Sequence, residues 1–219
     1  KEYIHMEELV YLEKFRGWVR PGTLDEYVFK EIRPSYNMLD IQEGDTVLDV
    51  GANIGAFSLY AEEQGASKIY AYEPDSDNFE ILKKNSPHSI NTKCAVVGDD
   101  SESVSLYINS KKNKGLHMTR EVNGRDCVTV PALNFNKIIQ DTKPNKIKID
   151  VEGAEYGFMP YIFPEHVEKL VMEIHFQYDS TWRAKGRGVH DSMLEQGFKP
   201  MREFRDTGKN WHTIGAYTR

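Results

Sequence analysis

The stretch "LDVGANIGAF" at 48–57 constrains the fold of this 219-residue chain more than any other. The apolar run at 46–50 is typical of a buried strand, and the apolar pattern that resumes after Gly55 is typical of a helix. Gly51 and Gly55 stand between them, and glycines after a strand let a ligand approach the backbone closely. We therefore predict a strand–turn–helix unit with a ligand at its turn.

Strand and helix patterns alternate along the rest of the chain, which is typical of a parallel sheet covered by helices. Strands are predicted at 46–50, 68–74, 91–98, 146–151 and 168–176, with an added antiparallel pair at 103–109 and 126–133. Helices are predicted at 55–65, 75–85 (with Asp75 as N-cap), 133–142 and 188–198. The tail predicts an antiparallel hairpin at the sheet edge. The fold class is therefore α/β, with a mostly parallel Rossmann-like sheet and helices on both faces.

The first 45 residues contain helical patterns at 7–15 and 24–32, which we expect to cover the α/β core at 46–219 within a single domain. The chain carries 28 basic and 34 acidic residues, a net charge of −6, which argues against nucleic acid or an anionic membrane as a partner. No apolar run reaches membrane-spanning length, and Cys94 and Cys127 have no metal-ligand spacing. We expect a cytoplasmic protein with free thiols.

Three kinds of ligand suit a glycine turn of this type: a dinucleotide, a nucleoside triphosphate and S-adenosylmethionine. The dinucleotide fingerprint needs a middle glycine, and Asn53 takes its place here. No Lys-Ser or Lys-Thr pair follows Gly55, so the triphosphate-binding loop is excluded too. S-adenosylmethionine carries no phosphate. Its amino group can face Asp49, directly or through water, while its methionine moiety approaches the backbone of Gly51, Ala52, Asn53 and Gly55.

The second predicted strand provides a further cofactor residue. It ends at Glu73, where nucleoside-binding α/β folds carry an acid that accepts hydrogen bonds from both ribose hydroxyls. Pro74 then stops the strand. At the end of the third strand, Cys94 and Ala95 offer small side chains that leave room for adenine. These residues complete the predicted binding site for S-adenosylmethionine.

Four segments resemble the FkbM family of S-adenosylmethionine-dependent methyltransferases. They are "KEI" with Tyr36, "DTVLDVGANIGAFSLYA", "IYAYEPDSDNFEILKKN" and, most specifically, "KIKIDVEGAEYGFM". The resemblance extends from about Glu31 to about His175 and implies a seven-stranded methyltransferase sheet. It also implies methyl transfer, in most described members to oxygen on sugars or natural products, without fixing the acceptor.

Methyl transfer requires an acceptor that is held in line with the methyl group and that loses its proton. The strands at 146–151 and 168–176 should end beside the methyl group, where Asp150 and Glu152 are also predicted to contact the cofactor. His175 is the predicted general base, because histidine titrates near neutrality. Glu173 is predicted to orient it or to hold the acceptor, and Asp150 is the third catalytic candidate.

Other interpretations of these residues stay open. Asp150 suits the N-cap of a following helix, and His175 suits an ordinary hydrogen-bonded histidine. Asp150, Glu173 and His175 also match the mixed carboxylate–imidazole sets that bind divalent ions, although no spacing demands a metal and we predict none. The predicted acceptor is a hydroxyl of a small molecule or glycan. The alternatives are an amine-bearing metabolite and, in a different class, a non-catalytic module that binds a nucleoside cofactor.

Two basic segments with glycine, 111–115 and 183–188, are predicted to be solvated loops. Their alternative role is recognition of an anionic acceptor, with Trp182 as a stacking surface. The longer segments 110–125 and 177–190, which contain them, are expected to be mobile and to cover the site once the acceptor has bound.

Overall fold

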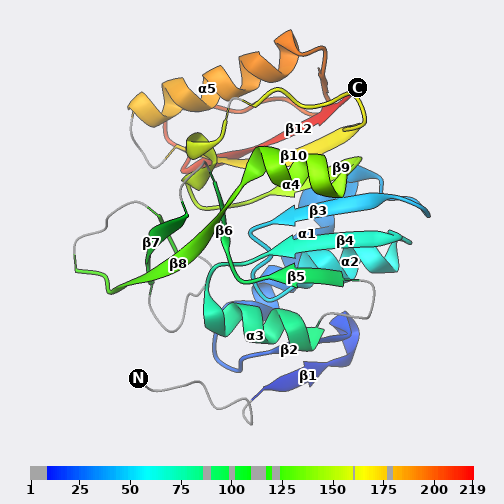
Figure 1. Cartoon of the computed structure of the whole chain (residues 1–219), viewed down its shortest axis with the longest axis vertical. Coiled ribbons are helices and arrows are strands. Elements are labelled where there is room, and N and C mark those ends of the chain that lie inside the picture. The colour runs from blue at the N-terminus through cyan, green and yellow to red at the C-terminus, as the bar shows by residue number, and fades with distance from the viewer. Residues whose placement is uncertain are drawn as a thin grey trace.

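A central sheet of seven strands organises the computed structural model, which describes residues 9–85, 90–98, 102–109, 117–119, 124–159, 161–176 and 180–219 (Figure 1). In spatial order the strands are β11 (Lys199–Pro200), β12 (His212–Thr218), β10 (Lys169–His175), β9 (Lys146–Ile149), β3 (Thr46–Val50), β4 (Lys68–Tyr72) and β5 (Ile90–Lys93). The five strands from β10 to β5 are parallel, and β12 pairs antiparallel with both β10 and β11. The predicted fold class, with its C-terminal antiparallel hairpin, is confirmed.

Helices cover both faces of this sheet, since successive residues of a strand point to opposite sides. The helices are α1 (Asp25–Tyr36), α2 (Ala56–Glu63), α3 (Ser76–Asn85), α4 (Phe135–Thr142) and α5 (Ser180–Glu195). On β3, Leu48 packs into the core beneath α4 and α5, whereas Val47 packs into the core beneath α1, α2 and α3. Short 3₁₀ turns are η2 (Glu13–Phe15), η3 (Asn37–Leu39) and η4 (Ala154–Gly157). Within the described residues no helix combines the length and the apolarity that crossing a bilayer requires.

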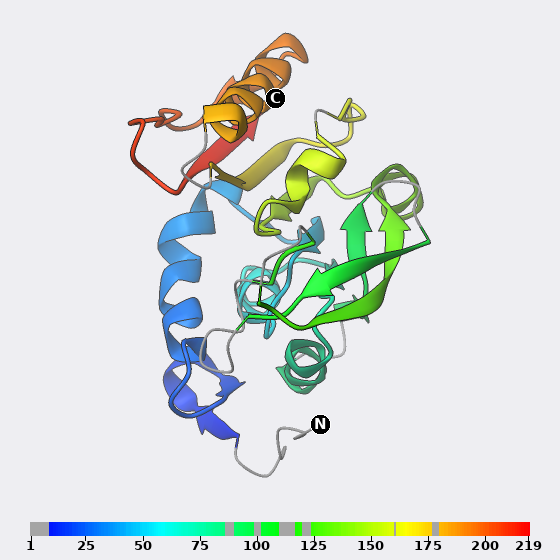
Figure 2. The ribbon, with the colours of Figure 1, turned by 90° about the vertical axis from the view of Figure 1, so that its left-hand side faces the viewer.

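A smaller sheet stands apart from the main one, with the order β6 (Val96–Gly98), β8 (Cys127–Asn134) and β7 (Ser103–Tyr107) (Figure 2). The predicted antiparallel pair is confirmed as β7 and β8. The single strand predicted at 91–98 is wrong, because the chain leaves the main sheet after Lys93 and β6 pairs with β8 instead. Val96, Leu106 and Val130 form a separate apolar cluster there, which explains why the strand divides.

The N-terminal segment differs from its prediction. Instead of a helix at 7–15, strand β1 (Val10–Leu12) forms a hairpin with β2 (Gly17–Val19), and residues 1–8 lie outside the described part. Arg16, in the left-handed conformation with φ of 53°, makes the tight turn. The helix predicted at 24–32 is confirmed as α1. Asp75 caps α3 as predicted, since its Oδ1 accepts a hydrogen bond from Asn78 N at 2.8 Å.

The basic segment 183–188 is also not a loop, because it lies inside α5. Arg183 is buried and donates to Asp206 and Asn210, and a Cβ on Gly186 would lie 2.6 Å from the Phe176 ring. Packing against other segments therefore stabilises a helix that its own glycines disfavour. Within the segment 177–190, which was expected to cover the site, the residues from Ser180 onward are helical. The other basic segment, 111–115, lies outside the described residues. So do the remaining parts of the two segments expected to cover the site, at 110–116, 120–123 and 177–179.

Candidate active site

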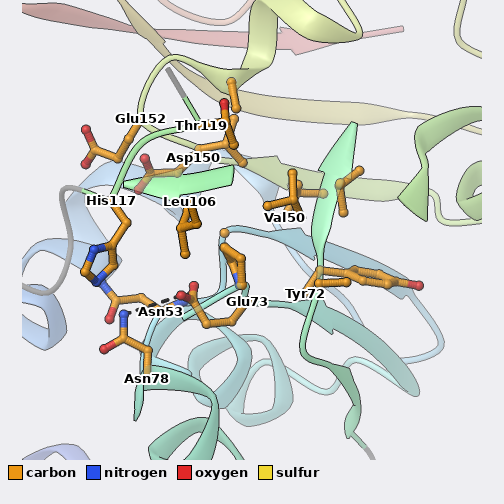
Figure 3. A pocket seen from close by; sticks show the side chains of 17 residues that line it. Val50, Asn53, Tyr72, Glu73, Asn78, Leu106, His117, Thr119, Asp150 and Glu152 are labelled. Atoms are coloured by element: carbon orange, nitrogen blue, oxygen red, sulfur yellow. Dashed lines mark hydrogen bonds between the residues drawn. The ribbon is translucent and has the colours of Figure 1, made fainter. Parts of the chain in front are cut away.

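The carboxyl ends of β3, β4 and β9 meet at one edge of the main sheet because these strands are parallel neighbours. A pocket opens there (Figure 3). Gly51 and Asn53 of the turn after β3 line it together with Glu73 at the end of β4, and Leu106 of the small sheet lines it as well. The sequence elements that resemble a cofactor site therefore do converge on one cavity.

The glycine turn is held mainly through its backbone. Gly51 has a φ of 79°, and a Cβ on it would lie 1.7 Å from the carbonyl oxygen of Asp150. Its N–H and that of Ala52 both donate to the Tyr72 carbonyl, at 3.0 and 2.9 Å. Gly55 has a φ of 88°. A Cβ on Gly55 would lie 2.7 Å from Leu82 Cδ1 of α3, so packing against the protein itself requires both glycines that were predicted to serve ligand approach.

Glu73 is buried with its carboxylate toward the turn. Oε2 accepts a hydrogen bond from Asn53 N at 2.8 Å, and Oε1 accepts one from Asp75 N at 3.0 Å. Burial, followed by the charge of Asp75, raises the pKa of Glu73 to about 7. Oε1 also accepts a longer bond from Asn78 Nδ2 at 3.4 Å, so about one of a carboxylate's roughly four lone-pair sites stays free for a ligand's hydroxyl group. Asn53 takes the left-handed conformation with φ of 51°, which asparagine tolerates better than most residues.

Asp49 lies beneath the turn and lines neither this pocket nor the adjoining cavity. Its Oδ2 accepts a hydrogen bond from Ser58 Oγ at 2.7 Å, and its Oδ1 lies 3.2 Å from Lys148 Nζ. Lys148 also donates to the Gly51 carbonyl, so the ion pair ties Asp49 to the turn. The arrangement leaves no direct path from Asp49 to a cofactor's amino group. Sequence analysis missed Lys148, whose signal is a lysine inside the apolar strand "KIKID".

Pro74 and Ala95 also line the pocket, but Cys94, whose thiol lies 3.7 Å from the Pro74 carbonyl oxygen, does not. His117 lines it close to Asn53 (Figure 3) and was not predicted, because its surroundings read as a polar loop. Its Nδ1 accepts a hydrogen bond from Asn109 N at 3.0 Å, which leaves the proton on Nε2.

Charged side chains gather where β9 and β10 end. His175 is buried, with Nδ1 3.3 Å from Glu155 Oε1 and Nε2 3.3 Å from Glu152 Oε2. Burial alone would lower its pKa, but the carboxylates of Glu155, Glu152 and Glu173 outweigh burial and raise the pKa of His175 to about 10. The imidazole therefore already holds a proton at neutral pH. The prediction that His175 titrates near neutrality is wrong, because sequence analysis could not place three carboxylates around it.

Asp150 and Glu152 lie next to this histidine. Burial, and then the charge of Glu173, raises the pKa of Asp150 to about 6, while burial raises that of Glu152 to about 8. Asp150 Oδ2 accepts a hydrogen bond from Tyr36 Oη at 3.4 Å. The N-cap of the following 3₁₀ turn is Gly153 without a side-chain cap bond, so the capping interpretation of Asp150 is wrong.

A second cavity adjoins the pocket on the side of α1. Tyr36, Lys148 and Glu173 line it, and so do Asp150 and Glu152, which line the first pocket as well. Gly51 and Asn53 of the turn also line both cavities, so two ligands, one in each cavity, would meet between the turn and these two carboxylates. Such an arrangement can hold a donor and an acceptor of a transferred group.

Comparison with known proteins agrees with this geometry. The family described as "Methyltransferase FkbM domain" matches residues 49–200. The chain belongs to the FkbM methyltransferase family. S-adenosylmethionine is accordingly its cofactor, and methyl transfer is its reaction class.

Relatives of this FkbM protein are distant. The hexuronic acid methyltransferase AglP of Haloferax volcanii is 25% identical over 148 residues, which cover 64% of this chain and 60% of that protein's length. Methyltransferase sdnD of Sordaria araneosa is 25% identical over 238 residues, covering 90% of each. Among solved structures, a ribosomal protein L11 methylase from Lactobacillus delbrueckii subsp. bulgaricus is 11% identical with a TM-score of 0.53, covering 92% of this chain and 83% of that one. The last likeness shows the shared fold alone.

Proposed function

We propose that this FkbM protein transfers the methyl group of S-adenosylmethionine to a hydroxyl of a small molecule or glycan. The observation that carries the proposal is the position of Asp150 and Glu152, which line both the pocket at Glu73 and the cavity beside α1. Donor and acceptor would meet at these carboxylates. The hexuronic acid methyltransferase of Haloferax volcanii, a relative that acts on a sugar acid, supports an acceptor of the sugar class.

The cofactor would lie along the first pocket. Glu73 accepts hydrogen bonds from its ribose hydroxyls, while Pro74 and Ala95 flank the adenine. The backbone of the turn at Gly51 and Asn53 faces the methionine end. The residues fit this group, because Glu73 keeps about one free acceptor site and faces the same pocket as Gly51 and Asn53 of the turn.

Methyl transfer then proceeds between the two cavities. Bound S-adenosylmethionine would supply an electrophilic methyl group, with sulfur keeping the electron pair of the broken bond as the acceptor oxygen bonds to the carbon. Asp150 and Glu152 hold the acceptor in line, and the carboxylates there take the hydroxyl proton. His175 fixes Glu152 through their 3.3 Å contact, as an imidazolium at neutral pH.

N-methylation of an amine is the second candidate, and one feature favours it. The cavity beside α1 is lined by the carboxylates of Glu31, Asp150, Glu152 and Glu173, which would attract a cationic amine. A non-catalytic module that binds the cofactor would have no use for this acidic lining. The panel of acceptors described next separates the candidates.

The test has two stages. Calorimetry with S-adenosylhomocysteine and with NAD measures which cofactor binds, and we expect binding of the first and none of the second. Labelled S-adenosylmethionine is then offered with uronic acids, neutral sugars, phenols and amines. Label on a hydroxyl of a sugar or small molecule supports the proposal, and label on amines alone would replace it with the second candidate. NAD binding without S-adenosylhomocysteine binding would refute it.

A further inference from the structure

Three potential metal ligands converge where β9 and β10 end. One oxygen each of Asp150 and Glu173 and one ring nitrogen of His175 all lie within 4.8 Å of one another. Glu173 and His175 share a face of β10, and Asp150 directly follows the neighbouring β9. Ligands about 2.1 Å from one ion lie roughly 3 to 4 Å apart, so small side-chain movements would close the set. Among the described residues no other group of three has this geometry.

The histidine is oriented in the way that metal-binding histidines are. Glu155 is fully buried and its Oε1 lies 3.3 Å from Nδ1 of His175, which leaves Nε2 on the other side of the ring, 3.3 Å from Glu152 Oε2 and 4.0 Å from Glu173 Oε1. Glu155 is itself fixed, because it accepts hydrogen bonds from the backbone N–H groups of Gly153 and His175, both at 2.8 Å. A carboxylate behind a histidine ligand sets its tautomer and ring orientation in metal sites.

The two carboxylates also have outer partners. His212 Nε2 lies 3.0 Å from Glu173 Oε1, and Tyr36 Oη donates to Asp150 Oδ2 at 3.4 Å. These groups come from β12 and α1, on separate sides of the cluster. Each candidate carboxylate ligand is therefore contacted by a side chain from another element, and such contacts orient the ligands of bound metals.

Negative charge is concentrated at the cluster. Asp150, Glu155 and Glu173 are all largely shielded from solvent, where repulsion between like charges is strong. Lys148 lines the same cavity, but its ammonium pairs with Asp49 and the Gly51 carbonyl. The two nearby histidines are the cluster's own cations, so a divalent ion would find excess negative charge to balance.

We propose that Asp150, Glu173 and His175 bind a divalent metal ion at the ends of β9 and β10, where the ion takes the place of the proton on Nε2 of His175. One imidazole with two carboxylates suits Mn²⁺ best, since Mg²⁺ prefers oxygen ligands only and Zn²⁺ favours nitrogen and sulfur. Asp150 and Glu173 line the cavity beside α1, so the ion would keep positions open toward the acceptor.

The ion gives the proposed function, on which this inference rests, a means of activating an alcohol. A hydroxyl bound to a divalent cation loses its proton more easily and is held in a fixed direction. The ion would make the acceptor's hydroxyl proton easier to remove, and Glu152, which lines both cavities and is not a ligand, would pass that proton to solvent. The acceptor oxygen would then bond to the methyl carbon as the carbon–sulfur bond breaks. An acceptor with two neighbouring oxygens, such as a diol or a hydroxy acid, would bind most tightly.

The test measures metal binding directly. The full chain is stripped with EDTA, dialysed and titrated with Mn²⁺, with free Mn²⁺ followed by electron paramagnetic resonance, and Mg²⁺ and Zn²⁺ are run in parallel. We expect one Mn²⁺ per chain. Glu173→Gln and His175→Gln should each weaken its binding by about a hundredfold or more, and His212→Gln by about tenfold, as outer-shell changes do. The control Glu203→Gln alters an exposed glutamate paired with Arg205 and should change nothing.

The outcomes separate this inference from the proposed function. S-adenosylhomocysteine binding is measured on the same samples, since the first pocket does not need the ion. Failure of the stripped wild type to bind millimolar Mn²⁺, or equal binding by all variants, refutes the metal site. Full methyl transfer in EDTA refutes it too, yet leaves the proposed function standing. If His175→Gln unfolds, Glu173→Gln decides the question, because Glu173 lies at the cavity surface.

Discussion

The turn after β3 and the ends of β9 and β10 lie at the same edge of the sheet, but they are held in place differently. At the turn, Gly51 contacts the neighbouring strands through its backbone, and Glu73 accepts hydrogen bonds from backbone N–H groups. At the ends of β9 and β10, charged side chains hold one another, with His175 between Glu152 and Glu155. The first region we call the cofactor side and the second the acceptor side.

The difference explains how a family can keep one cofactor and vary its acceptors. A backbone cradle tolerates few substitutions, because a side chain would collide with the next strand. A cluster of side chains can change one residue at a time, provided that its charges stay balanced. Substitutions on the two sides should therefore have separable effects, and the following predictions test that separation.

Gly51→Ala should have the largest effect. The new Cβ would lie 1.7 Å from the Asp150 carbonyl oxygen at a φ of 79°, so the turn must move. We expect the free energy of unfolding to fall by about 3 kcal/mol or more and cofactor binding to be lost. Gly208→Ala is the matched control, with a φ of 75° but nothing within 4 Å of the new atom. Equal melting temperatures for the two variants would contradict a backbone-held cofactor side.

Glu173→Gln should separate the two sides most cleanly. Glu173 lines the cavity beside α1 but not the pocket at Glu73, so affinity for S-adenosylhomocysteine should not change. Turnover should fall by about a hundredfold or more, since the group acts on the acceptor. Calorimetry and initial rates with the identified acceptor measure the two quantities. A parallel loss of cofactor affinity would show that the sides are coupled.

Glu73→Ala should give the reverse pattern. The cofactor's ribose hydroxyls would lose a buried acceptor, so affinity for S-adenosylhomocysteine should weaken by about 1–3 kcal/mol, and Glu73→Gln should be milder. Turnover at saturating cofactor should change little. Glu80→Gln, on the exposed face of α3, is the control. Unchanged affinity in Glu73→Ala would mean that β4 does not hold the ribose.

The smallest expected effect is a pH dependence of stability. The pKa of Glu73 is raised from 4.5 to about 7, chiefly by burial, so between these values the folded protein binds more protons than the unfolded chain. This contribution to stability is fully present below 4.5 and is lost as the pH rises through about 7. Glutamine does not titrate, so Glu73→Gln does not lose stability as the pH rises through about 7. Above this pH the variant should therefore have a higher melting temperature than wild type. A melting curve that shifts equally at all pH values would contradict it.

Local patterns were enough to predict most of the fold and the meeting of Gly51, Asn53 and Glu73 at one pocket. A strand followed by Gly51 and Gly55 leaves few alternatives, and Glu73 follows from the position of the next strand. Two errors share one cause, because the division of 91–98 into β5 and β6 and the helix over 183–188 depend on contacts with other segments of the chain. The hairpin of β1 and β2 is local, and its turn depends on the left-handed conformation of Arg16, which a helical pattern does not reveal.

The residues on the acceptor side could be predicted from the sequence, but their protonation states could not. Asp150, Glu173 and His175 could be named from strand ends, yet the protonation of His175 depends on Glu155, which approaches from the following turn. Asp49 shows the same limit, since its pairing with Lys148 requires β3 and β9 to be neighbours. The charge partners of a buried side chain depend on which strands and turns are neighbours in space, and a periodic sequence pattern does not show this.

A crystal structure with bound S-adenosylhomocysteine tests the central claim most directly. We predict both ribose hydroxyls within hydrogen-bonding distance of Glu73, adenine against Ala95, and the sulfur directed toward Asp150 and Glu152. The cavity beside α1 should stay open to an acceptor. A cofactor whose ribose does not touch Glu73, or whose sulfur points away from Asp150, would contradict the account.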